Sequence, residues 1–195
     1  MAKPTQSRPT QSRVYQIKIT LAGTEPPIWR RLLVPGSISL AELHRILQVA
    51  MGWQDDHLHA FESANRRARS RLEPGCDWDD EERVRLDQVL AREKSAMVYL
   101  YDFGDSWTHN VVVEKILSPA DGLTVPSCVG GARACPPEDC GGSWGYGELL
   151  EAIRDPRHPE HEDRIEWVGE HFDPERFDAD AVNARLAPRK RTRAA

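Results

Sequence analysis

Tyr99-Leu-Tyr-Asp-Phe-Gly-Asp-Ser-Trp-Thr-His-Asn-Val-Val-Val-Glu114 predicts a β-hairpin whose polar side chains gather near the turn. Apolar and aromatic residues fill 97–103 and again 107–117, and both runs suit a pleated sheet. Gly104-Asp105-Ser106 supplies the turn, because glycine tolerates positive φ and short polar side chains bond their own backbone. We therefore expect the following side chains to meet at one corner of the molecule: Asp102, Asp105, Trp107 and His109.

Two earlier segments predict further strands. Residues 14–22 alternate between apolar and polar side chains, which is the period of a half-buried strand. Residues 28–34 form a second apolar run after Gly23-Thr-Glu-Pro-Pro27, so the two segments predict an antiparallel hairpin with its prolines in the connection. Arg30 and Arg31 are adjacent and should therefore face opposite sides of the sheet.

A helix is predicted over residues 40–51. Ser39 precedes it as an N-cap, Glu42 completes a capping box, and Gly52 ends it as a C-terminal glycine. His44 lies among the apolar positions of this helix and is expected to be a partly exposed surface histidine rather than a ligand.

His57 and His59 are two residues apart, directly after Asp55 and Asp56. On a strand both rings would face the same side, which is a familiar arrangement for binding a metal ion. The alternative is that both histidines bond backbone groups or carboxylates at the start of a strand.

The segment from Pro126 to Tyr146 is rich in glycine and proline, so we expect an irregular loop. Long irregular segments in compact domains are more often functional than not. Without a secretory signal, clustered cysteines favour thiolate ligands or free thiols, with a 135–140 disulfide as the alternative under oxidising conditions. A zinc site here would draw on these candidates: Cys128, Cys135, Cys140 and His109.

The C-terminal third predicts helices. Residues 147–154 and the stretch around Ile165 carry apolar side chains at helical spacing, and Asp178 can cap a helix over 179–186. Together with the strands, these helices predict an α+β fold, in which the helix over 40–51 packs on an antiparallel sheet.

Composition bounds the class of protein. With 195 residues, 39% hydrophobic and 29% charged, the chain predicts one globular domain over 14–187, between a disordered tail (1–13) and a basic tail (188–195). No apolar run is long enough for a bilayer and residues 1–13 lack a signal-peptide core, so we expect a cytoplasmic protein without membrane contact.

Charge is unevenly distributed. The net charge of −5 becomes −12 for residues 14–187 once the +3 of residues 1–13 and the +4 of residues 188–195 are set aside. An acidic body argues against a broad nucleic-acid surface, and at most the basic tails would touch nucleic acid weakly.

Four blocks and their order resemble the plasmid pRiA4b ORF-3-like family, over roughly 15–186. The blocks are Pro27–Pro35, Asp56–Phe61, Tyr101–His109 and Cys135–Gly142. The resemblance implies an α+β domain on an antiparallel sheet. Members occur on plasmids and beside insertion elements, so it also implies a mobile-element origin, but it implies no reaction.

Two functional hypotheses follow, and the oligomeric state is left open by both. The first is a binding module in which the 99–114 hairpin and the 126–146 loop form a polar groove for a protein, peptide or small ligand, with Trp107, Trp144 and Tyr146 exposed for recognition. Its candidate ligand-binding residues are His57, His59, Asp102, Asp105, Trp107, His109, Glu138 and Asp139.

The alternative is a metal-dependent hydrolase or nuclease. Zinc or another divalent ion would bind the histidines and aspartates of this set, and Glu138 or Asp139 would act as general base. The phosphate-binding loop, the dinucleotide fingerprint, the nucleophile elbow and the His-Glu-x-x-His motif are all absent from the sequence. A third interpretation is that the same polar groups only fasten loops to the sheet.

Overall fold

The computed structural model describes residues 13–70, 76–118, 123–169 and 171–187. Its strands are β1 (Val14–Leu21), β2 (Trp29–Pro35), β3 (His59–Glu62), β4 (Arg67–Arg69), β5 (Asp79–Asp80), β6 (Ala96–Tyr101), β7 (Trp107–Leu117) and β8 (Ser127–Ala132). Its helices are α1 (Leu40–Met51), α2 (Leu86–Val89), α3 (Gly142–Arg154), α4 (His161–Val168) and α5 (Ala179–Leu186).

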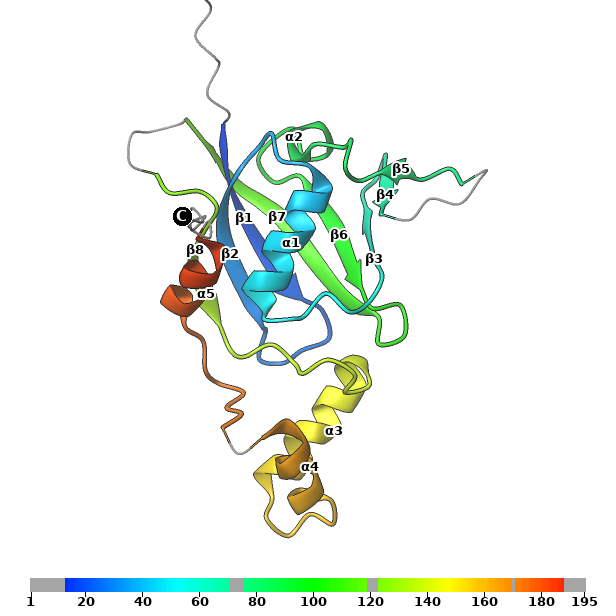
Figure 1. Ribbon diagram of the computed structural model, residues 1–195, viewed down its shortest axis with the longest axis vertical. Coiled ribbons are helices and arrows are strands. Elements are labelled where there is room, and N and C mark those ends of the chain that lie inside the picture. The colour runs from blue at the N-terminus through cyan, green and yellow to red at the C-terminus, as the bar shows by residue number, and fades with distance from the viewer. Residues whose placement is uncertain (1–12, 71–75, 119–122, 170, 188–195) are drawn as a thin grey trace, which may run out of the picture.

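The strands form one sheet in the order β5-β4-β3-β6-β7-β1-β2-β8 (Figure 1). All neighbouring strands are antiparallel except β4 and β5, which run parallel. The predicted α+β class is confirmed. The predicted tails lie outside the described residues apart from Arg13, and the domain limits of 14–187 stay a prediction.

The hairpin of β6 and β7 lies in the middle of the sheet, as its sequence predicted. Tyr101 pairs with Trp107 at the last position before the turn, and Tyr99 pairs with His109. On its other edge β7 pairs with β1. Ser106 and Asp102 both have positive φ, which lets the chain reverse within the five loop residues 102–106.

The segment 126–146 was expected to be irregular, and that expectation is wrong at both of its ends. Residues 127–132 form the edge strand β8, which pairs with β2 across a register shift between Arg31 and Leu32, and residues 142–146 begin helix α3. The Gly130-Gly131 pair lies beside this register shift, and a Cβ atom at Gly131 would lie 2.5 Å from the Phe177 ring, so glycine suits this part of the strand.

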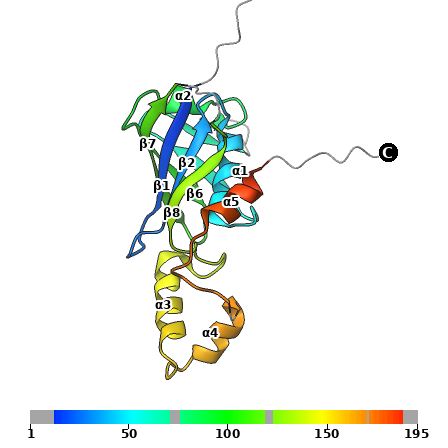
Figure 2. The ribbon, with the colours of Figure 1, turned by 90° about the vertical axis from the view of Figure 1, so that its left-hand side faces the viewer.

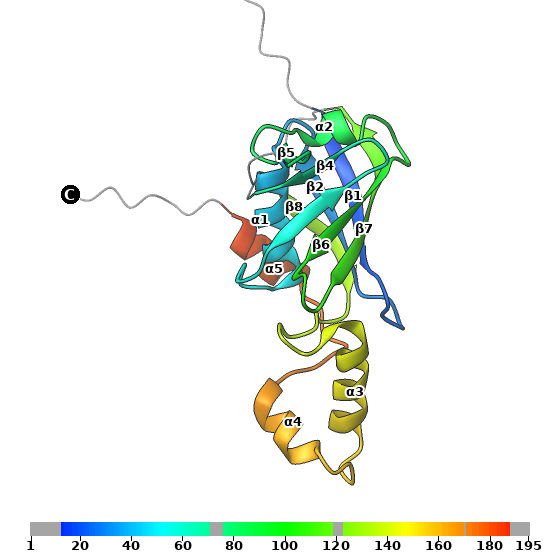
Figure 3. The same ribbon diagram turned by 90° about the vertical axis from the view of Figure 1, so that its right-hand side faces the viewer.

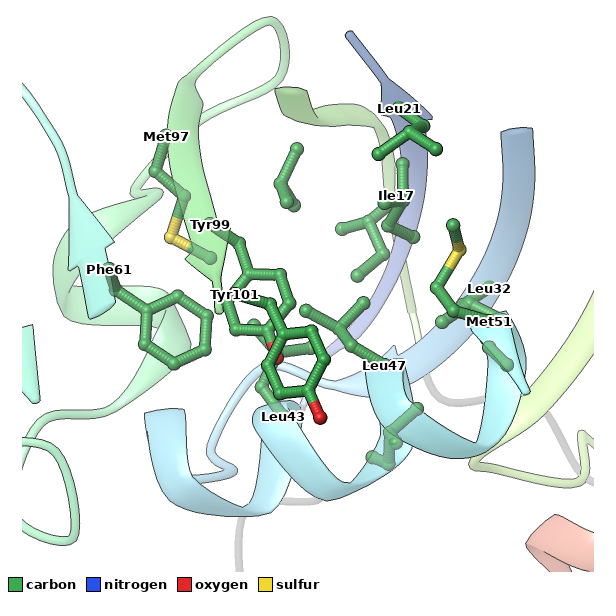
Figure 4. Packing of buried hydrophobic residues seen from close by; sticks show 14 of the residues in the cluster. Ile17, Leu21, Leu32, Leu43, Leu47, Met51, Phe61, Met97, Tyr99 and Tyr101 are labelled. Carbon is green, nitrogen blue, oxygen red and sulfur yellow. The ribbon is translucent and has the colours of Figure 1, made fainter. Parts of the chain in front are cut away.

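Helix α1 begins and ends as predicted. Ser39 and Glu42 form the reciprocal capping box, and Gly52 has a left-handed φ of 99°. Leu43, Leu47 and Met51 point from α1 toward strand side chains that include those of Ile17, Leu32, Tyr99 and Tyr101 (Figure 4). Because α1 and α5 lie on the same side of the sheet, the core sits between that face and these helices (Figures 2 and 3).

Arg30 and Arg31 face opposite sides of the sheet, as expected. Arg30 is buried and donates hydrogen bonds to the carbonyls of Ala50, Trp29 and Ala132. Arg31 lies on the other face, where it pairs with the Glu114 carboxylate at 2.6 Å.

The helices α3 and α4 extend beyond one end of the sheet (Figure 1). The chain then returns, and Asp178 caps α5 by accepting hydrogen bonds from the amides of Asp180 and Ala181, as predicted. In the part of the chain that the structure describes, none of the helices combines the length and apolar character needed to cross a membrane.

Candidate functional site

Two buried histidines from different elements stack against each other. His44 of α1 and His59 at the start of β3 have ring centroids 3.5 Å apart and ring planes 6° from parallel. Helical spacing places His44 on the same side as Leu40 and Leu47, which face the core, and it is only 5% exposed. The expectation that His44 is a surface residue is therefore wrong.

Each ring of this pair faces a carboxylate. His44 Nε2 lies 2.7 Å from Asp55 Oδ1, and His59 Nε2 lies 2.7 Å from Glu81 Oε2. The ligand atoms of His44, Asp55 and His59 lie within 4.8 Å of one another. We call the set His44, Asp55, His59 and Glu81 the imidazole–carboxylate cluster.

The surroundings keep the His44 ring oriented and neutral. Burial lowers its pKa, and His59 lowers it further, while the Asp55 carboxylate acts in the opposite direction. Its second nitrogen, Nδ1, lies 2.8 Å from the Tyr99 hydroxyl, which also accepts a hydrogen bond from Gln48 Nε2. Burial raises the pKa of Tyr99 well above its ordinary value, so this hydroxyl keeps its proton. A neutral imidazole is the form that binds metal ions.

A pocket of about 420 Å³ borders the cluster. All four cluster residues line it, together with Arg45 and Ser70. The Asp55 side chain is half exposed, whereas those of His44, His59 and Glu81 are buried. The cluster therefore has a buried floor and one side open to the pocket.

A second group of side chains that can bind a metal ion includes His57, two residues before His59. His57 Nε2 is 3.3 Å from Asp139 Oδ1, and His57 Nδ1 is 3.8 Å from Asp102 Oδ2. One ligand atom from each of these residues lies within 4.8 Å of the other two. We call these three residues the His57 triad. Its members were all singled out from the sequence, and their role in binding stays a prediction.

The prediction that His57 and His59 share one strand face is wrong. Strand β3 begins only at His59, and the preceding residues run irregularly, with a positive φ at Asp55. As a result His57 turns toward Asp102, whereas His59 turns toward Glu81.

The corner predicted for the hairpin forms only in part. His109 is fully buried in the core, with Nδ1 3.2 Å from the Tyr99 carbonyl oxygen and no hydrogen-bond partner for Nε2. Trp107 and Tyr146 are buried rather than exposed, and of the three predicted recognition aromatics only Trp144 is exposed. Trp107 and His109 are two residues apart on β7, so both point to the buried face of the sheet.

Two other candidates fasten the loop around residues 135–142 to its neighbours. Asp105 Oδ2 accepts a hydrogen bond from the Gly141 amide at 3.0 Å. Glu138 accepts hydrogen bonds from the Tyr101 hydroxyl and from the amide of Gln54. These three hydrogen bonds match the interpretation in which polar groups lock loops to the sheet.

A groove of about 540 Å³ runs beside this loop. Its lining includes Trp53, the 135–139 segment, Trp167 and Phe172. No residue of the 99–114 hairpin lines it, so the described groove differs from the one predicted between that hairpin and the 126–146 loop.

The four predicted zinc ligands do not come together. All four cysteines of the chain are free, and no convergent group of ligand atoms among the described residues includes a cysteine or His109. Burial raises the pKa of Cys140 to about 12 and also raises those of Cys128 and Cys135, so these groups are thiols in this structure. Cys128 instead lies in β8, with its thiol 3.5 Å from the Gly130 carbonyl oxygen.

Sequence reasoning missed His44 and Glu81 as members of a site, and it noted Asp55 only as a neighbour. For His44 a signal was present, because an ionisable side chain occupied a position in the apolar stripe of a helix. Glu81 carried no such signal, since it lies in a charged segment of the sequence. Its side chain is buried only because the chain folds this segment back against His59.

Comparison with other proteins identifies the family of this chain. A solved structure, that of the protein of unknown function MM3350 from Methanosarcina mazei Go1, superimposes with a TM-score of 0.81 at 39% sequence identity, over 88% of this chain and 98% of that one. The uncharacterised protein y4hQ of Sinorhizobium fredii is 41% identical over 161 residues, which cover 80% of this chain and 81% of y4hQ. Residues 13–181 match the family described as plasmid pRiA4b ORF-3-like protein. The chain therefore belongs to the plasmid pRiA4b ORF-3-like family.

Proposed function

We propose that this protein binds zinc or a similar divalent transition-metal ion at the imidazole–carboxylate cluster and acts as a metal-dependent hydrolase on a small polar substrate. The observation that supports this most strongly is the stacked pair of His44 and His59, each with its Nε2 atom directed at a carboxylate beside a pocket.

The donor set suits such an ion. Two imidazoles and one or two carboxylates are the ligands that zinc, iron and manganese take in catalytic centres with an open position. Parallel lone pairs cannot meet at one point, so binding would tilt the rings of His44 and His59 out of their parallel stack. Asp55 is the ligand nearest to solvent, and the open position would face the pocket on its side.

The outer contacts resemble those that orient metal-bound histidines. The Tyr99 hydroxyl holds His44 by its Nδ1 atom, so that Nε2 is directed at the cluster. Gln48 contacts both sides of this arrangement, because its Nε2 donates to Tyr99 and its Oε1 accepts the amide hydrogen of Asp55 at 3.1 Å. Such outer partners set the ring orientation and raise metal affinity.

A divalent ion held in this way would lower the pKa of a coordinated water and polarise a carbonyl or phosphoryl oxygen of the substrate. The pocket volume of about 420 Å³ suits a small molecule. Arg45 in the pocket lining offers a cation for a substrate carboxylate or phosphate, although it also pairs with Glu82 at 3.1 Å. The acidic body of the chain disfavours nucleic acid as the substrate.

A second candidate function is the binding module. The groove of about 540 Å³ beside residues 135–139 favours it, because Trp167 is about half exposed there and can pack against an apolar ligand group. A peptide or small molecule with an apolar anchor would fit this groove, and it would need no metal ion.

Zinc titration of metal-depleted, tag-free protein tests the proposed function. We expect the double variant His44→Ala/His59→Ala to lose one equivalent of tightly bound zinc that the wild type holds. His171→Ala, which removes an exposed histidine, serves as the matched control and should retain it. Hydrolysis of small ester and phosphate substrates by the zinc-loaded protein should disappear in the same double variant.

Circular dichroism of both variants keeps the result interpretable, since loss of zinc counts only for a folded protein. Equal zinc binding by the wild type and a folded double variant would contradict the proposed metal centre. Binding of a peptide or small molecule at the groove without metal would instead favour the binding module.

A further inference from the structure

We infer that the His57 triad is a second divalent-cation site, which takes a carboxylate-preferring ion such as Mn²⁺. The inference does not rest on the proposed hydrolase function, because it uses none of the residues of the imidazole–carboxylate cluster. His57, Asp102 and Asp139 come from three segments that are far apart in the sequence.

The first support is geometric. His57 lies between the two carboxylates, with its ring nitrogens 3.3 Å from Asp139 Oδ1 and 3.8 Å from Asp102 Oδ2. One ligand atom from each residue lies within 4.8 Å of the other two, so small side-chain movements would bring all three to the coordination distances of a single ion.

The second support is the environment of the Asp102 carboxylate. Its side chain is 11% exposed, and its Oδ1 accepts the amide hydrogen of Gly104 at 2.8 Å. Its other oxygen, Oδ2, faces His57 at 3.8 Å, which is too long for a hydrogen bond and leaves this oxygen able to coordinate an ion beside His57.

The third support is the local charge balance. Within the part of the chain that the structure describes, neither Asp102 nor Asp139 forms an ion pair with a lysine or arginine. Other acidic side chains lie near them, since Asp56 lines the same pocket as His57, and Glu138 precedes Asp139. The region is therefore short of positive charge, which a divalent ion would provide.

The ligand types indicate the class of ion. Two carboxylates and one imidazole favour Mn²⁺ and similar ions over Mg²⁺, which prefers oxygen ligands alone. The Asp139 side chain is 73% exposed, so the site opens to solvent and the ion should exchange readily.

Such an ion would join three loops. His57 precedes β3, Asp102 begins the turn of the central hairpin, and Asp139 belongs to the loop that lines the groove. Binding should therefore restrain residues 135–142 beside that groove. Without an ion, a protonated His57 would pair with the two carboxylates, and this is the competing explanation that the experiment must exclude.

The experiment uses Mn²⁺ and a protein that lacks the first cluster. In metal-depleted, tag-free His44→Ala/His59→Ala protein, electron paramagnetic resonance of the free ion should report one bound Mn²⁺ per chain. Adding Asp139→Asn should abolish this binding. Asparagine tolerates the positive φ of Asp139, so the variant should fold. Adding Asp163→Asn instead, at an exposed position in α4, should leave binding unchanged.

Hydrogen exchange gives a second measurement. Mn²⁺ should slow exchange of the amides of residues 135–142 in the wild type but not in Asp139→Asn. Absence of Mn²⁺ binding in the folded double variant would overturn the inference, as would binding that survives Asp139→Asn. If the wild type binds one Mn²⁺ that is lost in Asp139→Asn but kept in His44→Ala/His59→Ala, the second site stands, whatever the zinc titration reports for the imidazole–carboxylate cluster.

Discussion

Lowering the pH should destabilise this protein through His109, and replacing His109 with leucine should remove that effect. The side chain is fully buried, it has one hydrogen bond to the Tyr99 carbonyl, and its Nε2 atom has no partner. Burial lowers the pKa of His109 to about 4. In the unfolded chain the same group titrates at about 6.5.

The sign follows from proton uptake. Because the unfolded chain binds a proton at a higher pH than the folded protein, His109 costs no stability above about pH 6.5, and the loss grows as the pH falls toward about 4. A difference of this size between the two pKa values reduces the free energy of unfolding by about 2 kcal/mol between about pH 7 and about pH 5. His44, whose pKa is also lowered, adds a loss of the same sign.

The assay is urea unfolding of the wild type, of His109→Leu and of the exposed control His171→Ala at both pH values. At neutral pH His109→Leu should lie within about 1 kcal/mol of the wild type, because the lost hydrogen bond is offset by removal of an unpartnered buried nitrogen. Between the two pH values it should lose about 2 kcal/mol less than the wild type, and the contribution of His44 cancels in this comparison. Equal pH dependence of the wild type and His109→Leu would refute the reasoning.

Three further perturbations have defined outcomes. Arg30→Met should lower the free energy of unfolding by about 3 kcal/mol or more, because a buried guanidinium that donates to three carbonyls is lost. Arg31→Met, on the other face of the sheet, should cost less than about 1 kcal/mol. Thermal melting of the two variants measures the difference. Gly142→Ala should loosen the loop that carries Asp139, because Gly142 has a φ of 68° and a Cβ atom there would lie 2.5 Å from the Asp105 carbonyl oxygen. The amides of this loop should then exchange hydrogen faster than in the wild type, and unchanged exchange would contradict the prediction. Tyr99→Phe should weaken zinc binding by about tenfold, because the contact between the Tyr99 hydroxyl and His44 Nδ1 is lost. A zinc affinity equal to that of the wild type would show that Tyr99 does not orient His44 for metal binding.

Much of the fold followed from local sequence patterns. The 99–114 hairpin, the first strand pair and the capped helix over 40–51 all formed where alternation, turn residues and a capping box predicted them. These features depend on neighbours a few residues apart, so the physical cause is already present in the chain. The strand at 127–132 did not follow, because its glycine pair argued against a strand, and in the structure that pair lies beside a register shift in the pairing with β2.

The candidate site depended on contacts between distant segments. The sequence marked His57, Asp102 and Asp139 as polar residues near turns, and three loops brought them together. It marked His109 and the cysteines equally, yet the inward face of β7 buries His109 and the packing of β8 buries Cys128. Among the described residues, Cys135 and Cys140 belong to no convergent group of ligand atoms. His44, Asp55, His59 and Glu81 meet only because α1 lies across the sheet at the start of β3, a crossing set by side-chain packing over long sequence separations rather than by any local pattern.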